Sequence, residues 1–268
     1  MTTVTAENVD AGTAADLTAT WATLPRTLQP TTAGPDLLAL GGGSADWPER
    51  LASAAARGVR GIVLLDPSPV PARTVRELAA SVTVPVVVQT TWTPNPALAQ
   101  FRERWAPALN DAMTVRVVAR HAGGRPVEHL LLDEFTLVRA AVGAITRVSF
   151  ARLGEHGHAL VGELDGKFVH LQGVRTAVGA GEARLAALGA DQEHWLELPA
   201  PGTAAPARAA VSGPDGEQLL SPIHETGRRA MWRAVHRQLE TGGTGTDLTA
   251  LADDLDLVAA AVAQSLRC

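Results

Sequence analysis

Apolar residues in the first part of the chain fall into short continuous runs. The segments 36–40, 61–65 and 85–89 are almost entirely apolar, which is typical of strands that are buried on both faces. The stretches 46–57 and 72–81, which lie between them, follow Asp or Pro residues of the kind that begin helices. Strands that alternate with helices at this spacing predict a parallel α/β sheet.

The pattern changes further along the chain. Helical spacing of apolar residues predicts helices at 95–108 and 127–142, with a strand at 114–120 between them. Several short strand-like segments follow, and Asp165-Gly166 between two of them is a strong hairpin signal. The strand-like segments are 145–152, 158–164, 168–174, 183–188 and 195–198. Because they are joined by turns, they favour an antiparallel sheet. Residues 200–216 are expected to form a loop rich in Pro, Ala and Gly, and two closing helices are expected at 225–239 and 248–266.

The predicted fold class is therefore α/β (α+β), with a partial Rossmann-like parallel sheet followed by a large, mostly antiparallel sheet and packed helices. Residues 1–34 are rich in Thr and Ala and have few anchoring apolar positions, so they are predicted to form a loosely ordered arm with a short helix near 14–24. The sheet domains are predicted at 35–112 and 113–268. No internal repeat is visible.

The charge and cysteine content of the chain exclude some classes of binding partner and site. The 268 residues include 28 acidic and 23 basic side chains, which gives a net charge of −5 at pH 7. This balance lacks the basic footprint that nucleic acid or an anionic membrane requires, and it favours a small polar ligand or a protein partner. A single cysteine, Cys268, excludes an internal disulfide and a multi-cysteine metal site. We expect no metal site.

The beginning of the sequence gives an expectation about location. Residues 1–21 contain no Lys or Arg and no continuous apolar run, so they lack the regions of a signal peptide. No segment approaches the roughly 20 apolar residues that span a bilayer. A cytoplasmic location is expected.

Four segments carry a family resemblance. They are Asp36-Leu-Leu-Ala-Leu with Trp47-Pro-Glu-Arg, the string Gly61 to Pro67, the strand and Asn-Pro start at 86–96, and Gly123-Gly124 with the helix through Gly143. In order and pattern they resemble the Gfo/Idh/MocA oxidoreductases over roughly residues 35–264. The resemblance implies a Rossmann domain, a sheet domain whose open face commonly serves assembly, and activity on sugars or polyols with NAD(P).

The glycine fingerprint of that family is the first departure. No G-x-G-x-x-G occurs in the chain, and in this register about half of the dinucleotide domain is expected to be missing. A second register treats Gly41, Gly42 and Gly43 as a degenerate fingerprint that binds nucleotide, with Asp66 as the ribose-binding acid. Asp46 would then stand where the third glycine belongs, and its carboxylate would repel a pyrophosphate.

Two further departures concern the residues that the resemblance makes catalytic. The family's Glu-Lys-Pro corresponds to Leu65-Asp66-Pro67, and the only lysine of the sequence is Lys167, far along the chain. The family's Asp-x-x-x-His pair is inverted to His129-x-x-x-Asp133. Positions i and i+4 share a helix face, so this pair could raise the imidazole pKa and support proton transfer. An ion pair without catalytic function is the competing interpretation.

These departures lead to two hypotheses. The first is a non-dehydrogenase accessory or ligand-binding protein without a cofactor, which pairs through its sheet face with itself or with an intact Gfo/Idh/MocA-type partner. The alternative is an enzyme. It would be either a divergent NAD(P)-dependent oxidoreductase of a sugar or polyol, or a cofactor-free acid/base enzyme that uses His129 and Asp133 together with Asp66. The sequence leaves the question of catalysis open.

Overall fold

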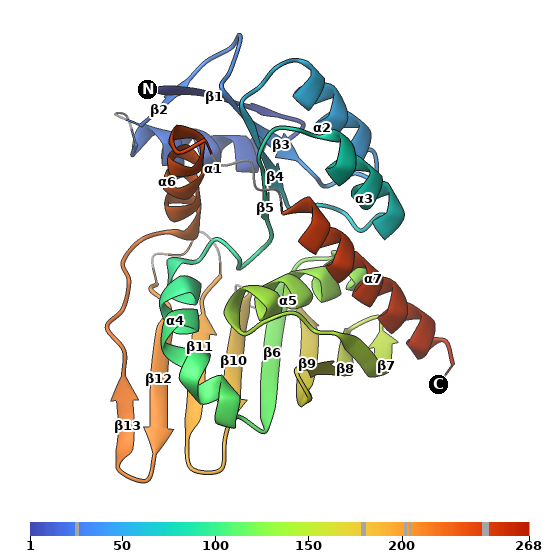
Figure 1. Ribbon diagram of the computed structural model, residues 1–268, viewed down its shortest axis with the longest axis vertical. Helices are drawn as coiled ribbons and strands as arrows, with labels where there is room; N and C mark the ends of the chain where they lie inside the picture. Colours follow the sequence, from blue (N-terminus) through green and yellow to red (C-terminus); the bar gives the residue numbers. More distant parts are fainter. Residues whose placement is uncertain (25–26, 178–180, 201–202, 204, 243–246, 268) are drawn as a thin grey trace. The chain divides into compact units, whose positions relative to one another are not determined.

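The computed structural model describes all residues except 25–26, 178–180, 201–202, 204, 243–246 and 268. The chain divides into two compact units, each made of two segments (Figure 1). The first unit comprises Met1–Pro94 and Gly227–Leu255, and the second comprises Asn95–Thr226 and Asp256–Cys268. These boundaries differ from those predicted at 34 and 112, because residues 1–34 are part of the first unit and residues 95–112 are part of the second. The chain also returns to the first unit at Gly227.

The first unit holds a five-stranded sheet in the order β2-β1-β3-β4-β5, in which every neighbouring pair is parallel. The predicted parallel α/β sheet is confirmed. Every residue of β3 and β4 is buried, which explains their continuous apolar runs. The strands are β1 (Thr2–Glu7), β2 (Leu28–Pro30), β3 (Leu37–Gly41), β4 (Gly61–Leu65) and β5 (Val86–Gln89). The helices are α1 (Ala11–Ala22), α2 (Trp47–Ala56), α3 (Ala72–Ser81) and α6 (Gly227–Glu240).

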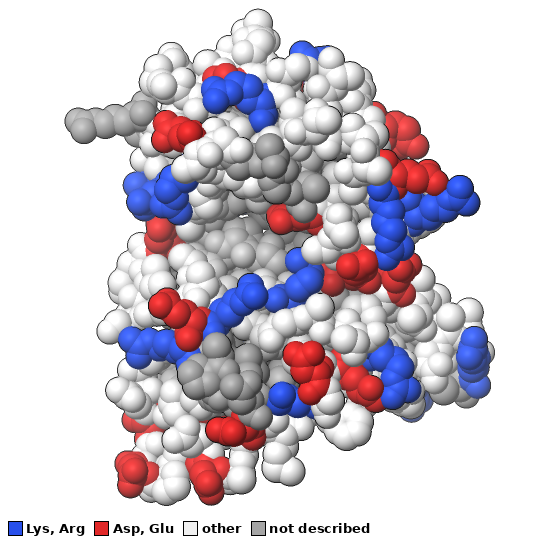
Figure 2. Space-filling model, viewed as in Figure 1, with Lys and Arg blue, Asp and Glu red and all other residues white. Residues whose placement is uncertain are grey.

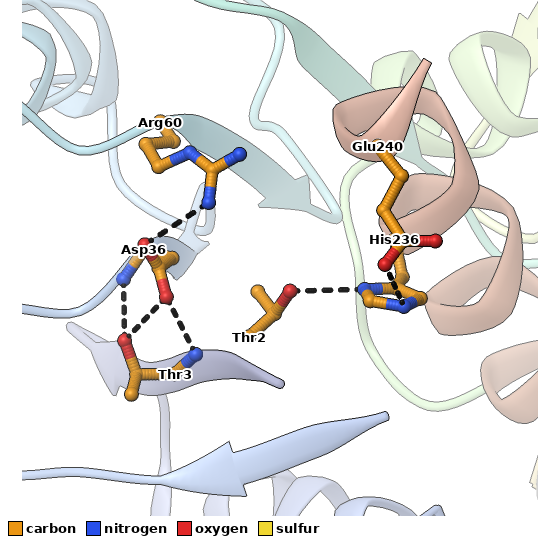
Figure 3. A network of polar contacts seen from close by, with 6 residues as sticks. All are labelled: Thr2, Thr3, Asp36, Arg60, His236 and Glu240. Atoms are coloured by element: carbon orange, nitrogen blue, oxygen red, sulfur yellow. Dashed lines mark hydrogen bonds and ion pairs between the residues drawn. The ribbon is translucent and has the colours of Figure 1, made fainter. Parts of the chain in front are cut away.

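The prediction of a loosely ordered arm at 1–34 is wrong, because this segment forms β1, α1 and β2. Asp36 accepts hydrogen bonds of 2.8 Å from both the backbone N–H and the hydroxyl of Thr3, which ties β1 to the start of β3 (Figure 3). The hydroxyl of Thr2 bonds Nδ1 of His236 at 2.9 Å and so ties β1 to α6. The strand was not predicted because half of its residues are threonine, whose β-branched side chain favours strands without being apolar.

Helix α1 is held by the apolar core of this unit. Leu17 and Trp21 face the sheet and α6, and the rings of Trp21 and Trp232 meet edge to face at 5.5 Å. Residues 1–34 therefore belong to the fold of the first unit.

The strand order shows what this sheet shares with a six-stranded dinucleotide fold of order 3-2-1-4-5-6. Strands β2, β1, β3, β4 and β5 correspond to 2, 1, 4, 5 and 6 of that order. The segment 31–36 joins β2 directly to β3, so one strand and its helix are lacking at the β2 edge. The expectation that half of the dinucleotide domain is missing is therefore wrong, because the first βαβ unit is present.

The second unit holds an eight-stranded sheet in the order β13-β12-β11-β10-β6-β9-β8-β7. All neighbouring pairs are antiparallel except β6 and β9, so the predicted, mostly antiparallel sheet is confirmed. The strands are β6 (Thr114–Ala122), β7 (Arg147–Gly154), β8 (Gly157–Leu164), β9 (Lys167–Thr176), β10 (Glu182–Leu188), β11 (Glu193–Leu198), β12 (Arg208–Gly213) and β13 (Gly216–Leu219). Helices α4 (Pro96–Asp111) and α5 (Val127–Ala141) belong to this unit. Helix α7 (Leu248–Ser265) belongs to the first unit up to Leu255 and to the second from Asp256.

Two local predictions in this unit have different outcomes. Asp165 and Gly166 form the predicted hairpin turn between β8 and β9, with φ angles of 48° and 77°. The loop predicted for 200–216 is wrong over 208–213, where β12 forms, and residues 201–202 and 204 of that prediction lie outside the described residues. Ala210 of this strand is fully buried against Trp195, so a small side chain fits at that position for packing.

One face of the large sheet is covered and the other is open. Helices α4 and α5 lie on the same face, where α5 packs on β6 and β9 and α4 packs on β11 (Figure 1). The opposite face carries the exposed side chains of the strands, among them Arg116 and Phe168. Among the described residues, none of the helices is both long and apolar enough to cross a membrane.

Candidate functional site

The carboxyl ends of β1 and β3 form the topological switch point of the parallel sheet. The chain leaves β1 toward β2 on one side and leaves β3 toward β4 on the other. Open α/β sheets bind ligands in the crevice at this point. The two loops are in close contact, because a Cβ atom on Gly41 would lie 1.9 Å from the carbonyl oxygen of Asn8. The candidate site is therefore built from the loops that begin at Asn8 and at Gly42.

The first of these loops contains Asp10. It is the N-cap of α1, and its carboxylate accepts hydrogen bonds from the backbone N–H of Thr13 at 2.9 Å and from the Thr13 hydroxyl at 2.6 Å. These bonds lower the pKa of Asp10. An ionised carboxylate therefore lies at the helix end whose free N–H groups and dipole attract anions. Asp10 was not predicted as a site residue, although the Asp-x-x-Thr string before a helix was its signal in the sequence.

The three glycines of the second register lie after β3. Gly42 uses its backbone N–H to bond the carbonyl of Leu65 at 2.7 Å, and its own carbonyl accepts from Ser68 at 2.7 Å. A Cβ on Gly42 would lie 2.6 Å from the Cα of Pro67, whereas Gly43 faces open space. Gly41 and Gly42 are thus required by loop packing. Because the run follows β3, it is not the first turn of the dinucleotide fold.

Asp66 stands at the carboxyl end of β4. Its backbone N–H bonds the carbonyl of Gln89 at 2.8 Å, and its φ of 45° is in the left-handed region that Asp tolerates better than most residues. The structure thus places a carboxylate at the strand end where the resembling family has a lysine. Lys167 begins β9 in the other unit.

His129 and Asp133 lie one turn apart on α5. Asp133 is buried and accepts a hydrogen bond from Nη1 of Arg125 at 3.1 Å. Burial and the positive charge of Arg125 lower the pKa of His129 to about 4, although Glu128 opposes the shift. The predicted rise of this pKa is therefore wrong, and the imidazole is neutral at pH 7. Asp66 belongs to the first unit and this pair to the second.

A buried polar cluster lies beneath α5 and was missed from the sequence. The carboxylate of Glu134 bonds Nε2 of His121 at 2.9 Å and Nε2 of His158 at 2.8 Å. All three residues are at most 5% exposed. The two imidazoles lower the pKa of Glu134 against the effect of burial. The available signal was the acidic pair Asp133-Glu134 inside the otherwise apolar run of α5.

The described residues contain no group of three His, Cys, Asp or Glu side chains that could hold a metal ion. His158 is on the covered face of the large sheet, whereas His170 pairs with Arg116 on the open face. On the face that Figure 2 shows, positive and negative side chains are interspersed.

Comparisons with known proteins identify the fold. No family model and no curated protein matches the chain. A putative NADPH-dependent oxidoreductase from Desulfitobacterium hafniense is 12% identical with a TM-score of 0.78, and the alignment covers 99% of this chain and 96% of that one. This is the fold of the Gfo/Idh/MocA-type oxidoreductases.

Two other solved structures with this fold hold nucleotide. KijD10, a 3-ketoreductase from Actinomadura kijaniata in complex with NADP and TDP-benzene, is 11% identical with a TM-score of 0.71, and 98% of this chain and 89% of that chain align. GenD2 from gentamicin A biosynthesis, in complex with NAD, is 15% identical with a TM-score of 0.65, and 98% and 86% align. At these identities the likeness shows the fold alone.

Proposed function

We propose that this chain is a ligand-binding or accessory protein with an oxidoreductase fold, and that it does not transfer hydride with NAD(P). The carboxylate of Asp10 on the N-terminus of α1 carries this proposal. In a dinucleotide fold, the pyrophosphate occupies the helix N-terminus after the first strand. Here that place holds a negative charge already bonded to Thr13, so the residues present do not fit a dinucleotide bound in this way.

The charge at the end of β4 supports the same proposal. A cation beside the reacting hydroxyl would stabilise negative charge that develops on oxygen, whereas the carboxylate of Asp66 would oppose it. The sequence holds one lysine, Lys167, and it begins β9. The ligand in this proposal is a small polar molecule without a pyrophosphate.

The second candidate is an enzyme, and the near-complete alignment with structures that hold NAD or NADP favours it. It would be a divergent NAD(P)-dependent oxidoreductase of a sugar or polyol. In a cofactor-free form, His129 and Asp133 would do the acid/base work. A neutral imidazole with a pKa of about 4 accepts a proton only weakly at pH 7, which makes His129 a poor general base.

Calorimetric titration with NAD and with NADP separates the proposal from the NAD(P)-dependent form of the second candidate. The proposal expects no binding to the wild-type chain, and micromolar affinity for either nucleotide would overturn it. Asp10→Ser keeps a capping hydroxyl and removes the charge, so it is expected to gain measurable affinity. Asp16→Asn, farther along the same helix, serves as the control and is expected not to gain. If Asp10→Ser gains nothing, the electrostatic reason is wrong.

We also propose that assembly, with a second copy or with an intact oxidoreductase, uses the apolar half of the open sheet face. Phe150, Phe168 and Val174 share this face and are 42%, 54% and 44% exposed. Light scattering after gel filtration is expected to show an oligomer that Phe168→Asp dissociates. A wild-type monomer in that measurement would exclude the second copy as the partner.

A further inference from the structure

The other half of the open face contains a pocket that the proposed function does not use. It lies over β6, β10, β11 and β12 and encloses about 630 Å³, which is within the range of small-molecule sites. Pro199, Ala205 and Pro206 are among its lining residues. All of its lining residues belong to the second unit, so the pocket is complete without the parallel sheet.

Positive charge predominates in this pocket. Four arginines and three glutamates line it, although the whole chain carries a net charge of −5. The charged lining residues are Arg116, Arg120, Arg184, Arg208, Glu182, Glu193 and Glu197. Nη1 of Arg120 donates a hydrogen bond to the carboxylate of Glu182 at 3.0 Å.

The remaining ion pairs are long. Arg184 lies 3.5 Å from Glu197 and 3.8 Å from Glu193, and Arg208 lies 3.6 Å from Glu197. Hydrogen bonds between nitrogen and oxygen are shorter, at about 2.7–3.2 Å. The guanidinium N–H groups of Arg184 and Arg208 therefore stay available to a ligand. Glu193 and Glu197 together balance these two charges, so the excess positive charge of the pocket comes from Arg116.

Arg116 is the pocket arginine without an ion-pair or hydrogen-bond partner within the described part of the chain. The register pairs Arg116 with Ala186, so Arg184 is its diagonal neighbour on β10. Diagonal neighbours lie about 7–8 Å apart, within the reach of two long side chains that approach the same group. Arg116 and Arg184 thus supply two cations to one part of the pocket.

The floor of the pocket is apolar. Val118, Ala186 and Leu198 line it, and Trp195 lies beneath the guanidinium groups of Arg184 and Arg208 at 5.1 and 5.8 Å. Stacking on an indole ring holds a guanidinium in place and leaves its edge N–H groups free. Two-point hydrogen bonding by such an edge suits a carboxylate or a phosphate.

From these observations we infer that the open sheet face holds a binding site for a small organic anion, with Arg116 and Arg184 as the groups that bind its carboxylate or phosphate. The carbon skeleton of the anion lies on the apolar floor, and Glu193 and Glu197 accept hydrogen bonds from its hydroxyl groups. This inference is independent of whether the chain binds nucleotide at the switch point.

Calorimetric titration of the full chain with citrate and with inorganic phosphate, at constant ionic strength, tests the site and separates the two anionic groups. The wild type is expected to bind at least one of them with a dissociation constant of about 1 mM or below. Arg116→Gln is expected to weaken binding about tenfold, which corresponds to 1.4 kcal/mol. Arg152→Gln is the matched control, because Arg152 is exposed on the same face and outside the pocket. It is expected to bind like the wild type.

Three outcomes would overturn the inference. The first is the absence of binding of either anion to the wild type. The second is an equal loss in Arg116→Gln and Arg152→Gln, which would indicate attraction to the general charge of the face. The third is a change of oligomeric state in Arg116→Gln without anion binding to the wild type, which would make Arg116 a contact for a protein partner. Circular dichroism of each variant verifies that it is folded.

Discussion

Replacing Glu134 by glutamine tests the buried polar cluster that joins α5 to the large sheet. The pKa of Glu134 is lowered, so its carboxylate is ionised, and Nε2 of both His121 and His158 must donate to it. The amide of glutamine can accept from one imidazole but presents N–H donors to the other. Moving the imidazole proton to Nδ1 does not help at His158, because that atom is buried and has no partner among the described residues.

The magnitude follows from the burial of the pair. A hydrogen bond to a buried charged group contributes about 1.5–3 kcal/mol, and leaving its donor buried without an acceptor costs about 1–3 kcal/mol, whereas a whole domain is stable by only about 5–15 kcal/mol. We therefore expect Glu134→Gln to lower the free energy of unfolding by about 3 kcal/mol at pH 7. Glu128→Gln is the control on the same helix. It removes only a partly exposed charge near the helix N-terminus and should cost less than about 1 kcal/mol.

Urea unfolding of the wild type and both variants, followed by circular dichroism, measures these differences. The pH dependence adds a second check. A carboxyl group whose pKa is lowered on folding stabilises the protein above its unfolded pKa, and this contribution is lost as the pH falls through the folded value. The wild type should therefore approach the stability of Glu134→Gln in acid, below the ordinary pKa of 4.5. A Glu134→Gln variant within about 1 kcal/mol of the wild type at pH 7, or a gap that widens in acid, would refute the reasoning.

Three further predictions concern stability. Gly41→Ala should lose at least about 2 kcal/mol in urea unfolding, because its Cβ would overlap the backbone at Asn8, whereas Gly43→Ala, which faces open space, should unfold like the wild type. Asp36→Ala removes the acceptor of two hydrogen bonds from β1 and should lower the free energy of unfolding by about 2 kcal/mol, and an unchanged value would contradict the role given to Asp36. Because the pKa of His129 is lowered on folding, the unfolded chain protonates this imidazole before the folded chain does as the pH falls from 6.5 to about 4. The free energy of unfolding of the wild type should therefore fall across that window more steeply than that of His129→Gln. Parallel pH dependences of the two proteins would contradict the shift.

The sequence by itself determined the elements whose residues repeat a local pattern. The runs at 36–40 and 61–65 are apolar because β3 and β4 are covered on both faces, and Asp165-Gly166 fixes its hairpin through backbone preferences alone. The two kinds of sheet followed from these local signals. The hydrophobic pattern does not predict strand β1, because its threonines count as polar residues. Only the packing of the sheet and α6 around this strand shows that it belongs to the core.

Only the tertiary structure decided the polar sites. His121, Glu134 and His158 come from β6, α5 and β8, and no local spacing predicts their meeting. The i, i+4 spacing of His129 and Asp133 predicted that they share one helix face. The burial that lowers the pKa of His129 depends instead on what packs around α5. Secondary structure depends on near neighbours in the chain, whereas the charge and hydration of a side chain depend on neighbours in space, which strand order and register set.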